Sequence, residues 1–145
     1  MTVVWTLAAL LASAPALAGE LAVEHYSSNP EMQLPFSEAV RVGNMLYLSG
    51  KLGIVPGTSQ LAEGGIAGET RQTLENIKAS LEKYGSSLDE VVKCTVFLAD
   101  IAEWGAMNEV YKTYFPTDPP ARSALGSSGL ALGARVEIEC LAAMR

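Results

Sequence analysis

The sequence predicts an α+β domain in which a single sheet carries two helices on one face. Short runs rich in apolar residues indicate strands at 39–42, 45–48, 91–98 and 136–144. Apolar residues recur at helical spacing over 66–84 and again from about 100 to 115. The resulting order is strand, strand, helix, strand, helix, strand, and two helices of this kind can cover one face of a sheet.

The composition supports a single folded domain and argues against nucleic acid as a partner. The chain has 145 residues, of which 49% are hydrophobic and 18% charged, so it can build a core. Its net charge is -6 and no two basic residues are adjacent. It therefore lacks the basic patch that nucleic-acid binding requires.

The first eighteen residues contain no charged side chain and end in Ala16-Leu17-Ala18, directly before Gly19-Glu20. This pattern resembles a secretory signal with an A-x-A cleavage site, although its start lacks Lys or Arg. The prediction is a signal peptide at 1–18 and a mature domain at 19–145, located in the periplasm or secreted. The apolar run is short for a membrane span, so we expect no membrane association after cleavage. The alternative is an apolar strand or helix belonging to the domain itself.

The first half of the mature chain has clear turn and helix signals. Residues 20–35 are polar and predicted to be irregular, and Gly43-Asn44 predicts a two-residue hairpin turn between the first two strands. The helix over 66–84 presents one apolar stripe and ends at Gly85. That stripe consists of Leu74, Ile77, Leu81 and Tyr84.

In the second half, the strand over 91–98 is predicted to turn Val92, Cys94, Val96 and Leu98 toward the core. Asp100 and Glu103 resemble a capping box for the second helix, which Pro116 stops. The aromatic side chains of that helix are predicted to be core. Its apolar side consists of Trp104, Met107, Tyr111 and Tyr114.

The sheet face away from the helices is predicted to be too apolar for free exposure and too charged for a core. We expect a subunit interface to cover it. This face carries Lys93, Thr95, Phe97, Glu137, Glu139 and Leu141.

The two cysteines, Cys94 and Cys140, both fall on the apolar face of predicted strands. Buried free thiols are the favoured interpretation, and export would permit a disulfide as the alternative. The single histidine, His25, lies far from both cysteines in the sequence, so no metal site is predicted.

Arg122 and Glu137 are the candidate functional residues. Arg122 follows a proline break, and its guanidinium can bind a carboxylate through two parallel hydrogen bonds. Glu137 lies in an apolar strand, which makes it a candidate proton carrier. The alternative for Arg122 is a structural salt bridge to Glu137 or another acid. The alternative for Glu137 and its neighbour Glu139 is a polar interface pair.

Several segments together resemble the reactive-intermediate deaminase (Rid, or YjgF-like) family, in its arginine-containing branch. The similar segments run in order over about residues 34–145 and comprise Gly43–Gly50, Arg71–Ile77, Val92–Phe97, Pro120–Leu125, Ser128–Leu130 and Val136–Ile138.

The resemblance implies a chorismate-mutase-like fold assembled as a homotrimer, with ligand clefts between subunits. It implies cofactor-free hydrolysis of small 2-imino and enamine acids to 2-keto acids and ammonia. In this interpretation Arg122 binds the substrate carboxylate, Glu137 activates or orients water, and Ser49 lines the cleft. Phe36 stands where many members have tyrosine, and Ala124 where many have cysteine.

These two departures leave a second function open. A non-catalytic protein that binds small carboxylates would keep Arg122 without needing precise placement of water. The changes at Phe36 and Ala124 also predict selectivity for a larger or less polar substituent.

Overall fold

The computed structural model describes residues 21–27 and 34–145. The proposed signal peptide at 1–18 lies outside these residues. In the described part, no helix is both long enough and apolar enough to cross a membrane. The strands are β1 (Val23–Tyr26), β2 (Ala39–Val42), β3 (Met45–Leu48), β4 (Lys51–Leu52), β5 (Val91–Leu98), β6 (Ala121–Gly126) and β7 (Val136–Ala143). The α-helices are α1 (Gly65–Lys83) and α2 (Trp104–Tyr114).

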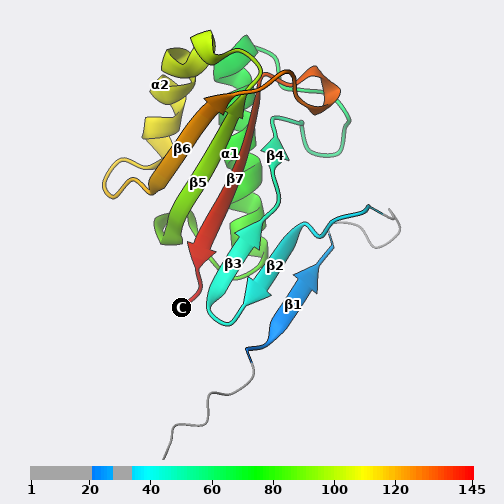
Figure 1. Ribbon diagram of the computed structural model, residues 1–145, viewed down its shortest axis with the longest axis vertical. Coiled ribbons are helices and arrows are strands. Elements are labelled where there is room, and N and C mark those ends of the chain that lie inside the picture. The colour runs from blue at the N-terminus through cyan, green and yellow to red at the C-terminus, as the bar shows by residue number, and fades with distance from the viewer. Residues whose placement is uncertain (1–20, 28–33) are drawn as a thin grey trace, which may run out of the picture.

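One mixed sheet with two helices on one face forms the domain, as predicted (Figure 1). The strand order is β1-β2-β3-β7-β5-β6, and β4 pairs with β7. All pairings are antiparallel except that of β5 with β6, which are connected through α2. This parallel crossover leaves β6 at the edge of the sheet, beside α2.

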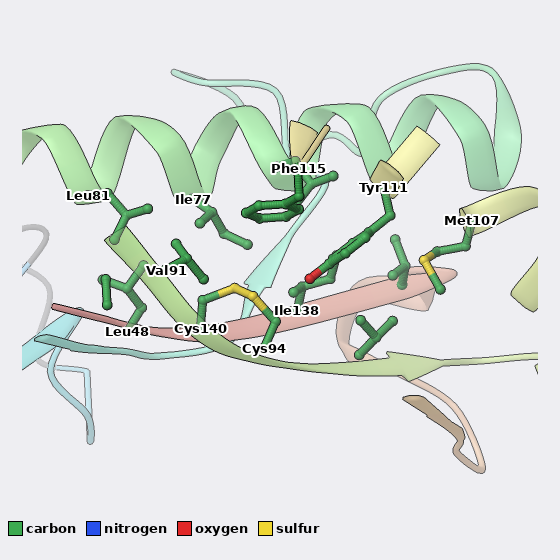
Figure 2. Packing of buried hydrophobic residues seen from close by; sticks show 14 of the residues in the cluster. Leu48, Ile77, Leu81, Val91, Cys94, Met107, Tyr111, Phe115, Ile138 and Cys140 are labelled. Atoms are coloured by element: carbon green, nitrogen blue, oxygen red, sulfur yellow. A yellow bond between two sulfur atoms is a disulfide. The ribbon is translucent and has the colours of Figure 1, made fainter. Parts of the chain in front are cut away.

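The core fills the space between the helices and the sheet (Figure 2). The predicted stripe of α1 is confirmed, because Leu74, Ile77 and Leu81 are all fully buried. Burying one such side chain contributes about 1.5–3 kcal/mol, which is why the periodicity sets the orientation of the helix. Gly85 follows the helix with φ +83°, a conformation that glycine adopts without strain.

The hairpin at Gly43-Asn44 is also confirmed, with Val42 paired to Met45 across the turn. Three short strands were not predicted. β1 falls in the stretch predicted to be irregular, β4 has only two residues, and β6 lies after two prolines. Each is short or at a sheet edge, so none shows a strong alternating pattern.

Two predictions of burial are wrong. Val92 is exposed and Val91 is buried instead, because a register irregularity between Val91 and Lys93 shifts the start of β5. Trp104 is 44% exposed and lies at the first turn of α2, beyond the part of that helix that packs on the core. Asp100 accepts a hydrogen bond from the Ala102 backbone N–H, but this bond caps the short 3-10 turn Ile101–Glu103 that precedes α2. The N-cap residue of α2 itself, Glu103, makes no capping hydrogen bond, so the capping box predicted for α2 does not form.

The favoured interpretation of the cysteines as free thiols is wrong. Cys94 and Cys140 are paired across β5 and β7, and their sulfur atoms form a disulfide in the core (Figure 2). The two Cα atoms are 4.1 Å apart, since neighbouring strands bring directly opposite residues this close. The long-range strand pairing that creates this contact is not visible in the local sequence.

Candidate functional site

Arg122 lies on β6, where its strand neighbour is Cys94. Residues in register share a face of the sheet, so Arg122 points to the same side as the helices. Its guanidinium carbon is 4.6 Å from the centre of the Tyr111 ring and 5.8 Å from that of Trp104. The side chain is half-buried and borders a cavity of about 370 Å³. The other residues lining this cavity are Asn108, Tyr111, Lys112, Phe115, Pro119 and Pro120.

The guanidinium of Arg122 has no carboxylate partner among residues 21–27 and 34–145. Its ion pair to Glu137, the structural alternative, does not form. Arg41, Arg135 and Arg145, in contrast, each contact a glutamate. The planar donors of Arg122 therefore remain available for an anion. Ala124, two residues further along β6, is half-buried and packs against the core on the same side.

Glu137 lies on β7, opposite Phe97 of β5 and Leu52 of β4. Its carboxyl group rests against the backbone of Gly50, where any Cβ atom would collide with the carboxylate oxygen. Glycine at this position therefore lets the carboxyl group approach the chain that links β3 to β4. The similar segment Gly43–Gly50 ends at this glycine, but no local pattern reveals its contact with Glu137, which lies far along the chain.

Ser49 and Phe36 lie in the same part of the molecule as Glu137. The Ser49 hydroxyl donates a hydrogen bond to the Ser37 carbonyl oxygen at 2.6 Å. Phe36 is 57% exposed and, together with Gly50 and other residues, lines a cavity of about 730 Å³. Glu137 does not line this cavity, but Gly50 both lines it and contacts the Glu137 carboxyl group. We therefore treat Phe36, Ser49 and Glu137 as one group of site residues near Gly50, and Arg122 and Ala124 as a second.

These two groups do not meet within one chain. Arg122 faces the helices, whereas Glu137 is in register with Phe97 and points to the open face. β5 also separates β6 from β7, which places these two strands about 10 Å apart across the sheet. Glu137 is in register with Leu125 rather than with Arg122, so the two side chains are also offset along the strands. A small acid held by Arg122 cannot reach Glu137 of the same chain through the sheet.

Glu38 is an important residue that the sequence analysis missed. Its side chain is 10% exposed and accepts hydrogen bonds from Lys51, Ser80, Lys83 and Tyr84 at 2.6–3.0 Å. Burial raises the pKa of this carboxyl, but the hydrogen bonds from Lys51, Tyr84 and Lys83 outweigh it and hold the pKa at about 2. Because its partners lie 13–46 residues away, no local pattern could reveal the cluster.

Glu38 joins the segment after Phe36 to β4 and to the end of α1. It also borders the 730 Å³ cavity, although its oxygens are already occupied by these partners. Its role is therefore to fix the segment that carries Phe36, rather than to accept a proton.

A half-exposed arginine with free donors, beside a cavity on an α+β sheet, defines a protein suited to binding a small anion. Comparison with known proteins narrows this class. The family model for endoribonuclease L-PSP matches residues 26–144. The chain therefore belongs to this family, which is also called the Rid/YjgF family.

Relatives and solved structures agree with this assignment. The mouse protein named 2-iminobutanoate/2-iminopropanoate deaminase is 44% identical over 108 residues, which cover 74% of this chain and 80% of the mouse protein. The crystal structure of the yeast protein YEO7 is 40% identical with a TM-score of 0.79, covering 86% of this chain and all of that one. RidA from an Antarctic Psychrobacter is 38% identical with a TM-score of 0.74, covering 83% of this chain and 94% of that one.

Proposed function

We propose that this protein hydrolyses small 2-imino and enamine acids to 2-keto acids and ammonia, without a cofactor, at clefts between the subunits of a homotrimer. The observation that carries this proposal is the free guanidinium of Arg122 beside a cavity, in a chain whose mammalian relatives are named as deaminases of such acids. The substrate carboxylate would pair with the planar donors of Arg122.

The separation of the two groups supports a shared cleft. Arg122 lies at one edge of the sheet, and Glu137 lies on the open face. Because β6 is an edge strand, a neighbouring subunit that packs around this edge can bring its own Phe36, Ser49 and Glu137 toward Arg122 of the first chain. One substrate would then contact both groups, which a single chain does not allow.

The chemistry requires only a fixed substrate, a water molecule and a proton carrier. Glu137 takes a proton from water as the oxygen attacks the imine carbon, and passes that proton to the imine nitrogen. In the carbinolamine, the hydroxyl proton then moves to the amine nitrogen through Glu137 as the C–N bond breaks, so that ammonia leaves and the keto acid remains. An enamine first becomes the imine by gaining a proton at its β-carbon and losing one from its nitrogen.

We also propose that residues 1–18 are a cleaved export signal and that the enzyme acts in the periplasm or outside the cell. The Cys94–Cys140 disulfide supports this location, because disulfides persist mainly in oxidising compartments. The mass of the protein isolated from its native host tests the proposal. A protein that retains residues 1–18 and stays in the cytoplasm would contradict it.

The test of function is ammonia release from a panel of freshly generated 2-imino acids. Arg122→Ala is expected to raise KM about 10- to 150-fold, since a hydrogen bond to a charged group contributes about 1.5–3 kcal/mol. Arg71→Ala is the matched control, because it removes the same charge from an exposed position on α1.

Two outcomes would count against the proposal. If wild-type protein releases ammonia no faster than buffer but is stabilised thermally by 2-keto acids, the non-catalytic carboxylate-binding function is the better account. If Arg122→Ala and Arg71→Ala behave alike, Arg122 does not bind the substrate.

A further inference from the structure

The guanidinium of Arg122 packs against two aromatic side chains of α2. It lies 4.6 Å from the centre of the Tyr111 ring and 5.8 Å from that of Trp104, both within the range of cation–π attraction. Tyr111 lies on the core side of the guanidinium, and Trp104, at the start of the helix, is exposed to solvent.

Tyr111 is itself held firmly in place. It is only 5% exposed, and its ring packs at a tilt on Phe115 with the ring centres 4.9 Å apart (Figure 2). Its hydroxyl is buried and has no hydrogen-bond partner among the described residues. Burial raises the pKa of this hydroxyl to about 12, so the ring stays neutral. A buried hydroxyl without a hydrogen-bond partner lowers the stability of the fold. The contribution of Tyr111 therefore comes from its aromatic ring rather than from its hydroxyl.

A guanidinium that rests on an aromatic ring keeps the N–H donors at its edge free. Those donors are the ones that a carboxylate engages in a two-point contact. An arginine free to rotate would lose this orientation, and part of the binding energy would be spent on fixing it again.

We propose that Tyr111 and Trp104 are positioning residues that hold the Arg122 guanidinium in the orientation that binds the carboxylate of the substrate. They act through Arg122 and touch no reacting atom. The inference rests on the proposed function for the identity of the substrate, but carboxylate binding can be measured without turnover.

The experiment measures the affinity of full-length protein for 2-oxobutanoate by calorimetry, together with KM and kcat for ammonia release. Tyr111→Leu removes the aromatic face and is expected to raise both Kd and KM about 2- to 30-fold, the range of a cation–π contact, with a smaller change in kcat. Tyr111→Phe keeps the face and is expected to restore Kd to within about twofold of wild type, a range well inside the cation–π contribution.

Two further variants separate positioning from packing. Met107→Ala removes a fully buried side chain of the same helix that does not line the cavity beside Arg122, so it should lower the thermal stability but leave Kd unchanged. Trp104→Leu alters an exposed position, so it should fold normally and still raise Kd, and Trp104→Phe should recover the affinity. The two Trp104 variants keep the test valid even if Tyr111→Leu does not fold.

The outcomes are distinct. The inference is overturned if 2-oxobutanoate does not bind wild type, if Trp104→Leu and Tyr111→Leu bind it as tightly as wild type, or if Tyr111→Phe loses as much affinity as Tyr111→Leu. If wild type binds the keto acid with the expected dependence on these rings but releases no ammonia from any imine, the positioning role stands and the proposed function fails.

Discussion

The guanidinium of Arg122 has different surroundings from those of the three arginines that contact a glutamate. Arg41, Arg135 and Arg145 each approach a glutamate, whereas Arg122 approaches two aromatic rings and a cavity. An arginine already paired with an acid would have to give up that pair to bind a ligand. The surroundings of Arg122 therefore favour binding, and within the described part of the chain this arginine forms no structural ion pair.

Phe36 and Ala124 lead to a prediction about substrate selectivity. Restoring the phenol and the thiol that many family members carry, in the double variant Phe36→Tyr/Ala124→Cys, should shift preference toward small, polar imines. We expect the ratio of kcat/KM for 2-aminoacrylate to that for a bulkier imine to rise several-fold, about what one hydrogen bond contributes. Competition assays with paired substrates measure this ratio directly.

A neutral control for that variant is Glu63→Gln, at an exposed position in the loop before α1 that lines neither of the two cavities. If wild type and the double variant rank the imines in the same order with the same ratios, the two departures do not set selectivity.

At the scale of elements, Glu38 joins the segment before β2 to β4 and the end of α1. Its pKa is lowered from 4.5 to about 2 in the folded state. A lowered pKa means that the ionised form stabilises the fold above about pH 4.5, and that this stabilisation is lost as the pH falls toward 2.

We therefore expect wild type to lose up to about 3 kcal/mol of unfolding free energy from this group alone between pH 5 and pH 2. Glu38→Gln should be less stable at pH 6 and should show a shallower loss on acidification. Urea unfolding at several pH values measures both. Parallel curves for wild type and Glu38→Gln would show that Glu38 does not cause the acid sensitivity.

The disulfide links the two central strands, β5 and β7, across a sequence separation of 46 residues. A crosslink that closes a loop of this length stabilises a protein by about 2–4 kcal/mol, mainly by restricting the unfolded chain. Reduction should therefore lower the unfolding free energy by this amount.

Urea unfolding with and without dithiothreitol measures the effect. The double variant Cys94→Ala/Cys140→Ala is the control, and it should be insensitive to the reductant. A thiol titration that finds two free cysteines in protein purified under oxidising conditions would contradict the pairing.

At the scale of the whole molecule, the open sheet face remains uncovered in a single chain. Tyr47 and Leu125 are more than 40% exposed there, and Phe97 and Leu141 are half-buried. An exposed apolar face of this kind usually marks an interface. In the proposed trimer, this face would be covered by the neighbouring subunits.

Tyr47→Lys is expected to convert the trimer to single chains and to abolish ammonia release, since the shared clefts would be lost. Analytical ultracentrifugation measures the mass of the assembly. Ile101→Lys is the matched control, because it places the same charge at an exposed apolar position on the helical side. A Tyr47→Lys protein that stays trimeric, or a wild type that is monomeric, would contradict the prediction.

The sequence by itself determined the α+β class, the hairpin, both helices and the two long strands, because each depends on local periodicity and turn residues. It also made Arg122 and Glu137 candidate site residues, because a charged residue stands out beside a proline break or within an apolar segment. These features depend on interactions between residues close together along the chain.

Only the tertiary structure decided what surrounds those residues. The pairing of Cys94 with Cys140, the packing of Arg122 on Tyr111 and the cluster around Glu38 all join residues that are distant in sequence. The structure also placed Arg122 and Glu137 on opposite faces of the sheet. Strand order and register fix these relations, and both result from the packing of the whole domain rather than from any local pattern.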